Sequence, residues 1–289
     1  MFFVCSAKFN DTAVPERFLF FERKIERHFK TYRKFKIFGG LKSDGFQNLY
    51  KHPKFSLFMV SKAPRHIAII LDGNRRYAKK IGLQPWKGHN LGVEKLHKLL
   101  NWCIELGIKE VTLYSFSTEN FRRTKTELNF LFNIFKREFN SMKNREDIFK
   151  NKIRVNVIGR LYMFPKDIRK AMLEIMEKTK KHNKFIVNFA MAYGGRQEIV
   201  DAVKKIMENS KKLRQSQINE GLITKNLYLQ SEPDLVIRPG GEKRISNFLI
   251  WQSSYSELIF IDKLWPEFDK EDLVKCIEEF NRRERRFGK

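Results

Sequence analysis

Runs of apolar residues recur along the chain from residue 66 onward, and stretches with helical spacing separate them. Six runs have the length and composition of buried strands: 66–72, 110–117, 152–159, 185–193, 234–240 and the short 258–261. The first run, HIAIILD, contains five consecutive aliphatic residues. A strand without polar alternation is buried on both faces, which is typical of a parallel sheet covered by helices.

Helical patterns occupy the intervals between these strands. A stripe of leucines from Leu91 to Leu106 separates the first two strands, and Gly107 follows it. Three further helices are expected at 127–139, 165–179 and 196–209. The alternation predicts an α/β fold class, with a single domain whose mostly parallel central sheet is flanked by helices.

Residues 1–62 differ in composition from the rest of the chain. They hold 12 of the 27 phenylalanines, and their lysines and arginines clearly outnumber their aspartates and glutamates. Within 17–38, four apolar residues at helical spacing lie among cations: Phe18, Phe21, Ile25 and Phe29. This pattern fits an amphipathic helix on an anionic membrane, or equally a helix packed on the main domain with a solvated cationic face. We therefore divide the chain into an N-terminal extension, 1–62, and a main domain, 63–289.

Polar residues follow several of the strands at their carboxyl ends, where open α/β sheets bind their ligands. Arginines and glycines occupy 72–76, 117–123, 193–196 and 238–244. One such segment is usually only a solvated surface or the end of a strand. Four of them at the same edge of one sheet favour a receptor for phosphate oxygens, built from guanidinium groups and exposed backbone N–H groups.

Asp72 stands among these cations at the end of the first strand. We expect its carboxylate to hold a divalent metal on a phosphate, because Mg²⁺ takes only one or two carboxylates beside water and substrate oxygens. Lys87 and His89, at the start of the following helix, are candidates for additional phosphate contacts. For His89, a capping or packing role is the alternative.

The formal net charge of +25 predicts a polyanionic partner: nucleic acid, anionic lipid or a phosphorylated substrate. The sequence has no GxxxxGK[ST] loop, no GxGxxG after the first strand, no His/Cys cluster with zinc spacing and no GxSxG turn. It also has no RNA-recognition sheet motif and no zinc module. We therefore expect phosphorylated substrates and no nucleic acid.

An ordered set of segments now carries a family resemblance: HIAIILDGNRRYAKK, LYSFSTENFRR, YGGR, DLVIRPGGEKRISNFLIWQ, LWPEFD and RRERRFG. The set, over about 64–288, resembles the cis-prenyltransferases, which include undecaprenyl and dehydrodolichyl diphosphate synthases. The resemblance implies a Mg²⁺-dependent polyprenyl diphosphate synthase. It would extend an allylic diphosphate, usually farnesyl diphosphate, with successive isopentenyl diphosphates, to a long polycis precursor of dolichol or undecaprenol.

The resemblance also implies roles for individual residues. Around the allylic diphosphate are expected Asp72 with its Mg²⁺, Gly73, Asn74, Arg75, Arg76 and His89. The loop that closes on the substrate and helps condensation has Ser117, Asn120, Phe121 and Arg123. The residues implied in isopentenyl diphosphate binding are Arg238, Arg244 and Ser246. Asp72, Asn74, Ser117 and Asn120 are the expected catalytic residues.

Two further roles imply a site shared between subunits. Glu257 corresponds to a carboxylate that joins the metal shell from the neighbouring subunit, and Arg286 and Gly288 correspond to a tail that reaches across a dimer. A catalytically silent scaffold subunit would lose the Asp-Gly-Asn-Arg segment, so we expect a self-sufficient homodimer. A prenyl diphosphate synthase of the trans type would need DDxxD motifs, which the sequence lacks.

Some features remain open at this point. Leu131, Phe132 and Phe135 are candidates for the wall of a hydrocarbon tunnel, or they belong to the core. Pro85 stands where some relatives have an arginine that contacts the allylic diphosphate, and Lys87 is a candidate to replace it. We expect peripheral membrane association at the cytosolic face of the endoplasmic reticulum, with a cytoplasmic or organellar location as the alternative.

Overall fold

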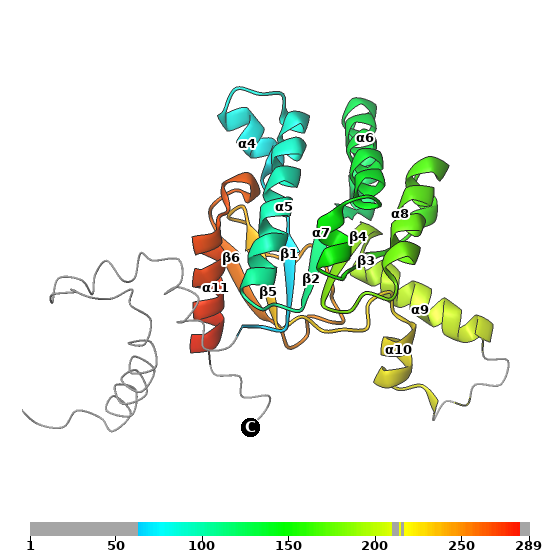
Figure 1. Cartoon of the computed structure of the whole chain (residues 1–289). Coiled ribbons are helices and arrows are strands. Elements are labelled where there is room, and N and C mark those ends of the chain that lie inside the picture. The colour runs from blue at the N-terminus through cyan, green and yellow to red at the C-terminus, as the bar shows by residue number, and fades with distance from the viewer. Residues whose placement is uncertain (1–62, 210–213, 215–216, 284–289) are drawn as a thin grey trace, which may run out of the picture. The chain divides into compact units, whose positions relative to one another are not determined.

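The computed structural model of the chain describes residues 63–209, 214 and 217–283 (Figure 1). The chain separates into two units, Met1–Ser56 and Leu57–Lys289, and only the second contains described residues. The expected amphipathic helix at 17–38 and the boundary at residue 62 lie outside the described residues, and so do Arg286 and Gly288.

Six strands form one sheet in the order β3-β4-β2-β1-β5-β6, and each pairing is parallel. The strands are β1 (His66–Ile70), β2 (Glu110–Ser117), β3 (Ile153–Ile158), β4 (Phe185–Tyr193), β5 (Leu235–Pro239) and β6 (Glu257–Ile261). This confirms the predicted α/β class, and β2 and β4 have the predicted bounds. We expected a mostly parallel sheet, and in the described residues the sheet has no antiparallel pair.

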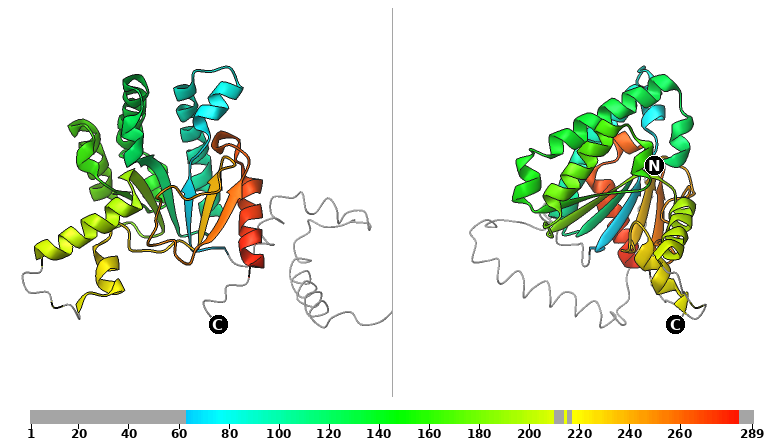
Figure 2. Two further views of the ribbon diagram at one scale, coloured as in Figure 1. Left: turned by 180° about the vertical axis from the view of Figure 1, so that it is seen from behind. Right: turned by 90° about the vertical axis from the view of Figure 1, so that its right-hand side faces the viewer.

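Helices cover both faces of this sheet (Figure 2). The α-helices are α4 (Asn74–Lys80), α5 (Gly88–Glu105), α6 (Lys125–Met142), α7 (Glu146–Lys150), α8 (Lys166–Thr179), α9 (Gly195–Asn209), α10 (Glu220–Asn226) and α11 (Lys270–Arg282). The predicted helices correspond to α5, α6, α8 and α9. The short α4, α7 and α10 and the C-terminal α11 were not predicted. None of the helices in the described part of the chain has the length and apolar content to cross a membrane.

The central strand β1 is buried along its whole length, which explains its uninterrupted apolar run. Its neighbours are β2 on one side and β5 on the other, with Ile67 opposite both Val111 and Leu235. The larger core cluster contains Leu99 of α5 and Ile277 of α11, both fully buried. Because β1 is held from both sides and both faces, the residues that follow it start from a rigid point.

The chain turns sharply where β1 ends. Gly73 has a φ of 106°, a conformation that glycine adopts without strain, and it precedes the first residue of α4. A Cβ at this position would lie 2.9 Å from the side chain of Leu264. The turn directs Asp72 and α4 to the carboxyl edge of the sheet.

Candidate active site

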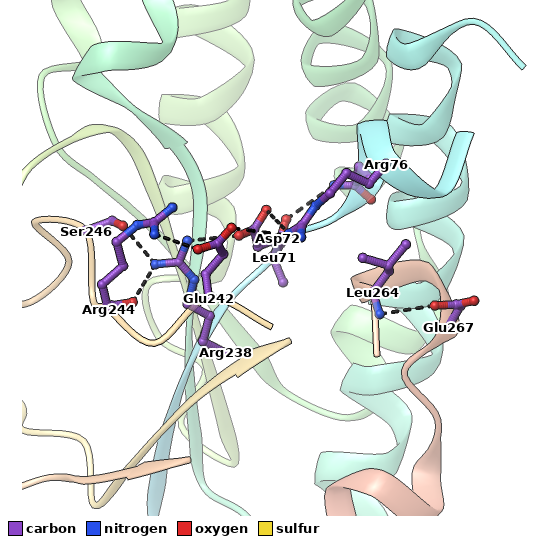
Figure 3. A network of polar contacts seen from close by, with 10 residues as sticks. Leu71, Asp72, Arg76, Arg238, Glu242, Arg244, Ser246, Leu264 and Glu267 are labelled. Carbon is purple, nitrogen blue, oxygen red and sulfur yellow. Dashed lines mark hydrogen bonds and ion pairs between the residues drawn. The ribbon is translucent and has the colours of Figure 1, made fainter. Parts of the chain in front are cut away.

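Asp72 lies in a network of arginines at the carboxyl edge of the sheet (Figure 3). Arg238, the fourth residue of β5, donates from Nη2 to Asp72 Oδ2 at 2.8 Å. Arg76, one turn into α4, has its Nη2 3.3 Å from Asp72 Oδ1. Both carboxylate oxygens therefore face guanidinium groups, and each group comes from a different element.

Arg238 is the most buried member of this network, with 5% of its surface exposed. Its Nη1 donates to Ser246 Oγ at 2.8 Å and also to the carbonyl oxygen of Arg244. Arg244 in turn donates to Glu242 Oε2 at 2.6 Å, and its own side chain is 61% exposed. The network therefore changes from a buried anchor at Arg238 to exposed cations at Arg76 and Arg244.

A second polar cluster surrounds Glu127, which is 3% exposed in the first turn of α6. Its Oε1 accepts from Arg123 Nη1 at 3.0 Å and lies 3.2 Å from His89 Nε2. Arg75 Nε lies 3.7 Å from the same oxygen. One buried carboxylate thus holds three basic side chains from α4, α5 and the loop before α6.

Asn74 and the loop after β2 complete the rim. The Asn74 side chain donates to the carbonyl oxygen of Leu71 at 3.3 Å, and its Oδ1 is buried without a hydrogen-bond partner among the described residues. A Cβ on Gly92 would lie 2.3 Å from that oxygen, so a side chain at position 92 would displace the Asn74 amide. Ser117 and Asn120 cap the 3₁₀ turn Thr118–Arg122, where the Ser117 backbone N–H donates to Asn120 Oδ1 at 3.1 Å.

A cavity of about 560 Å³ opens beneath this rim. Its mouth is lined by polar side chains: Asp72, Asn74, His89, Ser117, Asn120, Arg123 and Ser246. Farther in, its wall is apolar and is contributed mainly by Leu96, Leu131, Ile134, Phe135, Phe139 and Met142. Pockets of this size accept drug-sized ligands. The arrangement fits an amphiphile with a strongly anionic head and a long hydrocarbon tail.

Comparison with known proteins identifies the family. Residues 70–288 match the family model described as "Putative undecaprenyl diphosphate synthase". This chain is a cis-prenyltransferase. It is 50% identical over 230 residues to the tritrans,polycis-undecaprenyl-diphosphate synthase (geranylgeranyl-diphosphate specific) of Pyrococcus horikoshii, covering 78% of this chain and 87% of that one. The enzyme of the same description from Methanocaldococcus jannaschii is 47% identical over 255 residues, covering 86% and 91%.

Solved structures agree with this assignment. Lavandulyl diphosphate synthase from Lavandula x intermedia, in complex with dimethylallyl diphosphate, has a TM-score of 0.75 at 33% identity and covers 78% of this chain and 99% of its own. A probable undecaprenyl diphosphate synthase from Campylobacter jejuni has a TM-score of 0.66 at 37% identity and covers 79% and 100%. The cis-prenyltransferase fold therefore extends over the described domain.

Most of the predicted site residues of this cis-prenyltransferase lie together. Seven line the cavity mouth, and Arg76, Arg238 and Arg244 join Asp72 through the arginine network. Arg75 contacts Glu127, the carboxylate that also contacts the mouth residues His89 and Arg123. Gly73 forms the turn into α4. Phe121 packs its ring edge-on against Phe116, with 4.9 Å between ring centroids, and does not line the cavity. Its substrate contact stays a prediction.

Glu257 lies away from the rim within this subunit. It is the first residue of β6 and pairs with Leu235 at the start of β5, whereas Asp72 follows the end of β1. Within the subunit, its carboxylate lies 2.9 Å from Arg283 Nη1. The expected role of Glu257, joining the metal shell from a neighbouring subunit, stays a prediction.

The three candidates for the tunnel wall do not all reach the cavity. Leu131 and Phe135 line it, and both also pack in the larger core cluster. Phe132 does not line it and lies in an aromatic cluster, with its ring centroid 5.8 Å from that of Phe164 and 6.4 Å from that of Phe116. Phe135 belongs to the same cluster, with its ring centroid 5.6 Å from that of Phe116.

A bound Mg²⁺ fits the side chains at the rim. In the described ranges, no group of three or more His, Cys, Asp or Glu side chains is arranged to hold a metal ion by itself. The Asp72 side chain is 29% exposed and lines the cavity mouth. One accessible carboxylate suits an ion that takes its remaining ligands from water and diphosphate oxygens.

Sequence reasoning missed Glu127, Tyr114 and Glu242. Tyr114 lines the cavity and donates to the carbonyl oxygen of Ser246 at 3.3 Å. Glu242 links the exposed guanidinium groups of Arg244 and Arg76. The i,i+4 spacing of Arg123 and Glu127 across the start of α6 was the available signal for Glu127. Spacing alone does not reveal that this carboxylate is buried.

The protonation state of His89 makes folding depend on pH. Burial, with a smaller contribution from the neighbouring Arg123, lowers the pKa of His89 from 6.5 to about 4. The folded protein therefore binds fewer protons than the unfolded chain between these values, so the free energy of unfolding should fall as the pH falls through this window. Urea unfolding at several pH values should show a shallower decline for H89Q. Equal slopes for both proteins would contradict the assignment.

Proposed function

We propose that this prenyltransferase extends an allylic diphosphate by successive additions of isopentenyl diphosphate, and gives a long polycis-polyprenyl diphosphate. The observation that carries the proposal is the position of the Asp72–Arg238–Arg76 network directly above a cavity with an apolar wall. The positive charge of the network suits two anionic diphosphate groups. The apolar wall of the cavity suits the hydrocarbon chain, which grows with each addition.

The reaction joins the first carbon of the allylic substrate to the terminal alkene carbon of isopentenyl diphosphate. The allylic carbon–oxygen bond breaks, inorganic diphosphate leaves, and the new unit loses one proton. Arg75 and Arg76, both about half exposed, are suited to hold the departing diphosphate, whose negative charge grows in the transition state. Arg238, Arg244 and Ser246 form a connected group suited to orient isopentenyl diphosphate beside it.

Mg²⁺ is part of the proposal. Asp72 is the side chain we assign to hold the ion, which when bound would neutralise diphosphate charge and so ease departure of the leaving group. Arg238 and Arg76 contact the two oxygens of Asp72. Arriving diphosphate oxygens can take over these guanidinium contacts, because arginine binds phosphate and carboxylate with the same paired N–H geometry.

We take geranylgeranyl diphosphate as the primer and an undecaprenyl-type diphosphate as the product. The support comes from the archaeal relatives, which are described as specific for geranylgeranyl diphosphate. They favour this primer over the farnesyl diphosphate expected from the sequence, and they give no support to the expected dolichol product. A shared homodimeric site with Arg286 and Gly288, and membrane association at the endoplasmic reticulum or elsewhere, stay predictions.

Incubation of the full chain with labelled isopentenyl diphosphate, Mg²⁺ and one primer at a time tests the proposal. We expect long polyprenyl products, faster incorporation with geranylgeranyl than with farnesyl diphosphate, and loss of incorporation with EDTA that excess Mg²⁺ restores. Preference for farnesyl diphosphate would overturn only the primer assignment. No elongation with either primer, or a single condensation onto dimethylallyl diphosphate, would overturn the proposed function.

A further inference from the structure

A second histidine–glutamate pair lies in the cavity wall, away from the mouth. His97 of α5 has its Nε2 3.2 Å from Oε2 of Glu138 on α6, and both side chains line the cavity. The exposed fractions of these side chains are 35% and 16%, so the pair is only partly shielded from water. It joins the same two helices as His89 and Glu127, the pair at the mouth.

The second pair is farther along the cavity than the first. Each of α5 and α6 connects two parallel strands of the sheet, so both helices run from the carboxyl edge toward the opposite edge. At 1.5 Å per residue, His97 lies about 12 Å along α5 from His89. A hydrocarbon tail that starts at the Asp72 network therefore passes the mouth pair first and meets the second pair as it grows.

The surroundings of the second pair are apolar. Leu131, Ile134 and Phe135 line the cavity along α6 before Glu138, and Phe139 and Met142 follow it. Most of these side chains are buried in the core. His97 and Glu138 thus form a polar interruption in a hydrocarbon-compatible wall.

Additional contacts hold Glu138 in this position. Its Oε1 accepts from Arg137 Nε at 2.9 Å, and Arg137 Nη2 donates to Asn90 Oδ1 of α5 at 3.4 Å. The close approach of the His97 imidazole, with a further contribution from Arg137, lowers the pKa of Glu138, so this carboxyl group is ionised at neutral pH. The pair is a polar link between α5 and α6 that also fixes a charge at the cavity surface.

We propose that His97 and Glu138 are specificity-determining residues that limit the length of the product. This inference rests on the proposed function. Each isoprenoid unit that packs against Leu131, Ile134 or Phe135 removes apolar surface from water, which favours further growth of the chain. A unit pressed against the pair instead removes water from the Glu138 carboxylate and the His97 imidazole and provides no replacement hydrogen bonds, which disfavours growth past that point.

The product profiles of three variants test this inference. With excess isopentenyl diphosphate, the dephosphorylated products of H97L/E138L should shift to longer chains, and the wild-type length should no longer be the main product. E138Q keeps the shape of the side chain but removes its charge, so it should shift the profile less and in the same direction. E94L removes an exposed glutamate from α5 and serves as the matched control, with the wild-type profile expected.

Two results would overturn the inference. One is an unchanged profile for the folded double variant. The other is a shift to shorter chains, because the bulk of these side chains rather than their polarity would then limit growth. If the double variant fails to fold in a thermal melt, E138Q decides, and an unchanged profile for E138Q overturns the inference. Failure of the wild-type chain to elongate any primer would be recognised separately, because it removes the proposed function itself.

Discussion

D72N should lose activity on the order of a hundredfold or more while the protein stays folded. Asparagine removes the negative charge with which, in our proposal, the side chain at position 72 holds Mg²⁺. It retains an oxygen that can accept a hydrogen bond from Arg238. Arg238 also keeps its bonds to Ser246 and to the carbonyl oxygen of Arg244, so its buried guanidinium is not left without partners. The loss of folding free energy should therefore stay within about 1–3 kcal/mol.

Initial rates at saturating Mg²⁺, together with thermal melts, measure both parts of the D72N prediction. D167N is a matched control, because Asp167 is 51% exposed on α8 and pairs with Lys136 at 2.7 Å on the surface. Removing an exposed ion pair of this kind should leave both the stability and the rate nearly unchanged. Wild-type turnover by D72N at saturating Mg²⁺ would rule out the metal role of Asp72.

E127Q should be the most destabilising of the proposed single changes. Glutamine removes the charge that compensates Arg123, whose own side chain is 25% exposed, and it also weakens the contacts with His89 and Arg75. Breaking a buried pair by neutralising one partner costs about 3–5 kcal/mol, and partial exposure of Arg123 reduces the expected loss to about 2–3 kcal/mol. Activity should fall as well, because Arg123 lines the cavity mouth.

Guanidinium unfolding of E127Q measures this loss, and E174Q provides the comparison. Glu174 is 39% exposed and pairs with Lys143 at 2.5 Å, so the same chemical change there should cost much less stability than E127Q. The double variant R123L/E127L should be more stable than E127Q, because it leaves no uncompensated charge between these two positions. Equal unfolding midpoints for E127Q and the wild type would show that Glu127 does not anchor this cluster.

The sequence predicted the strands better than the helices, for a physical reason. A strand buried on both faces is a continuous apolar run, and 110–117 and 185–193 match β2 and β4 at both ends. Short helices bury few side chains and carry weak periodicity, which explains why α4, α7 and α10 were missed. The C-terminal α11 buries Leu273, Ile277 and Phe280 at helical spacing, so the signal for this helix was present in the sequence and was missed.

The site was predictable at the level of the sheet edge and not at the level of contacts. Parallel strands bring their carboxyl ends together, so Asp72 and Arg238 were expected to meet, and they lie 2.8 Å apart. Glu127 and the His97–Glu138 pair are different, because their positions depend on how α5 and α6 face each other across the cavity. No strand end or short motif marks that relation between two helices.

A crystal structure with Mg²⁺ and an unreactive thio analogue of geranylgeranyl diphosphate tests the central claim most directly. We expect the diphosphate to lie at Asp72 and Arg76, with Mg²⁺ on the Asp72 carboxylate. The tail should enter the cavity beside Leu131 and Phe135 and extend toward His97 and Glu138. A diphosphate bound away from Asp72, or a tail that lies outside this cavity, would contradict the account.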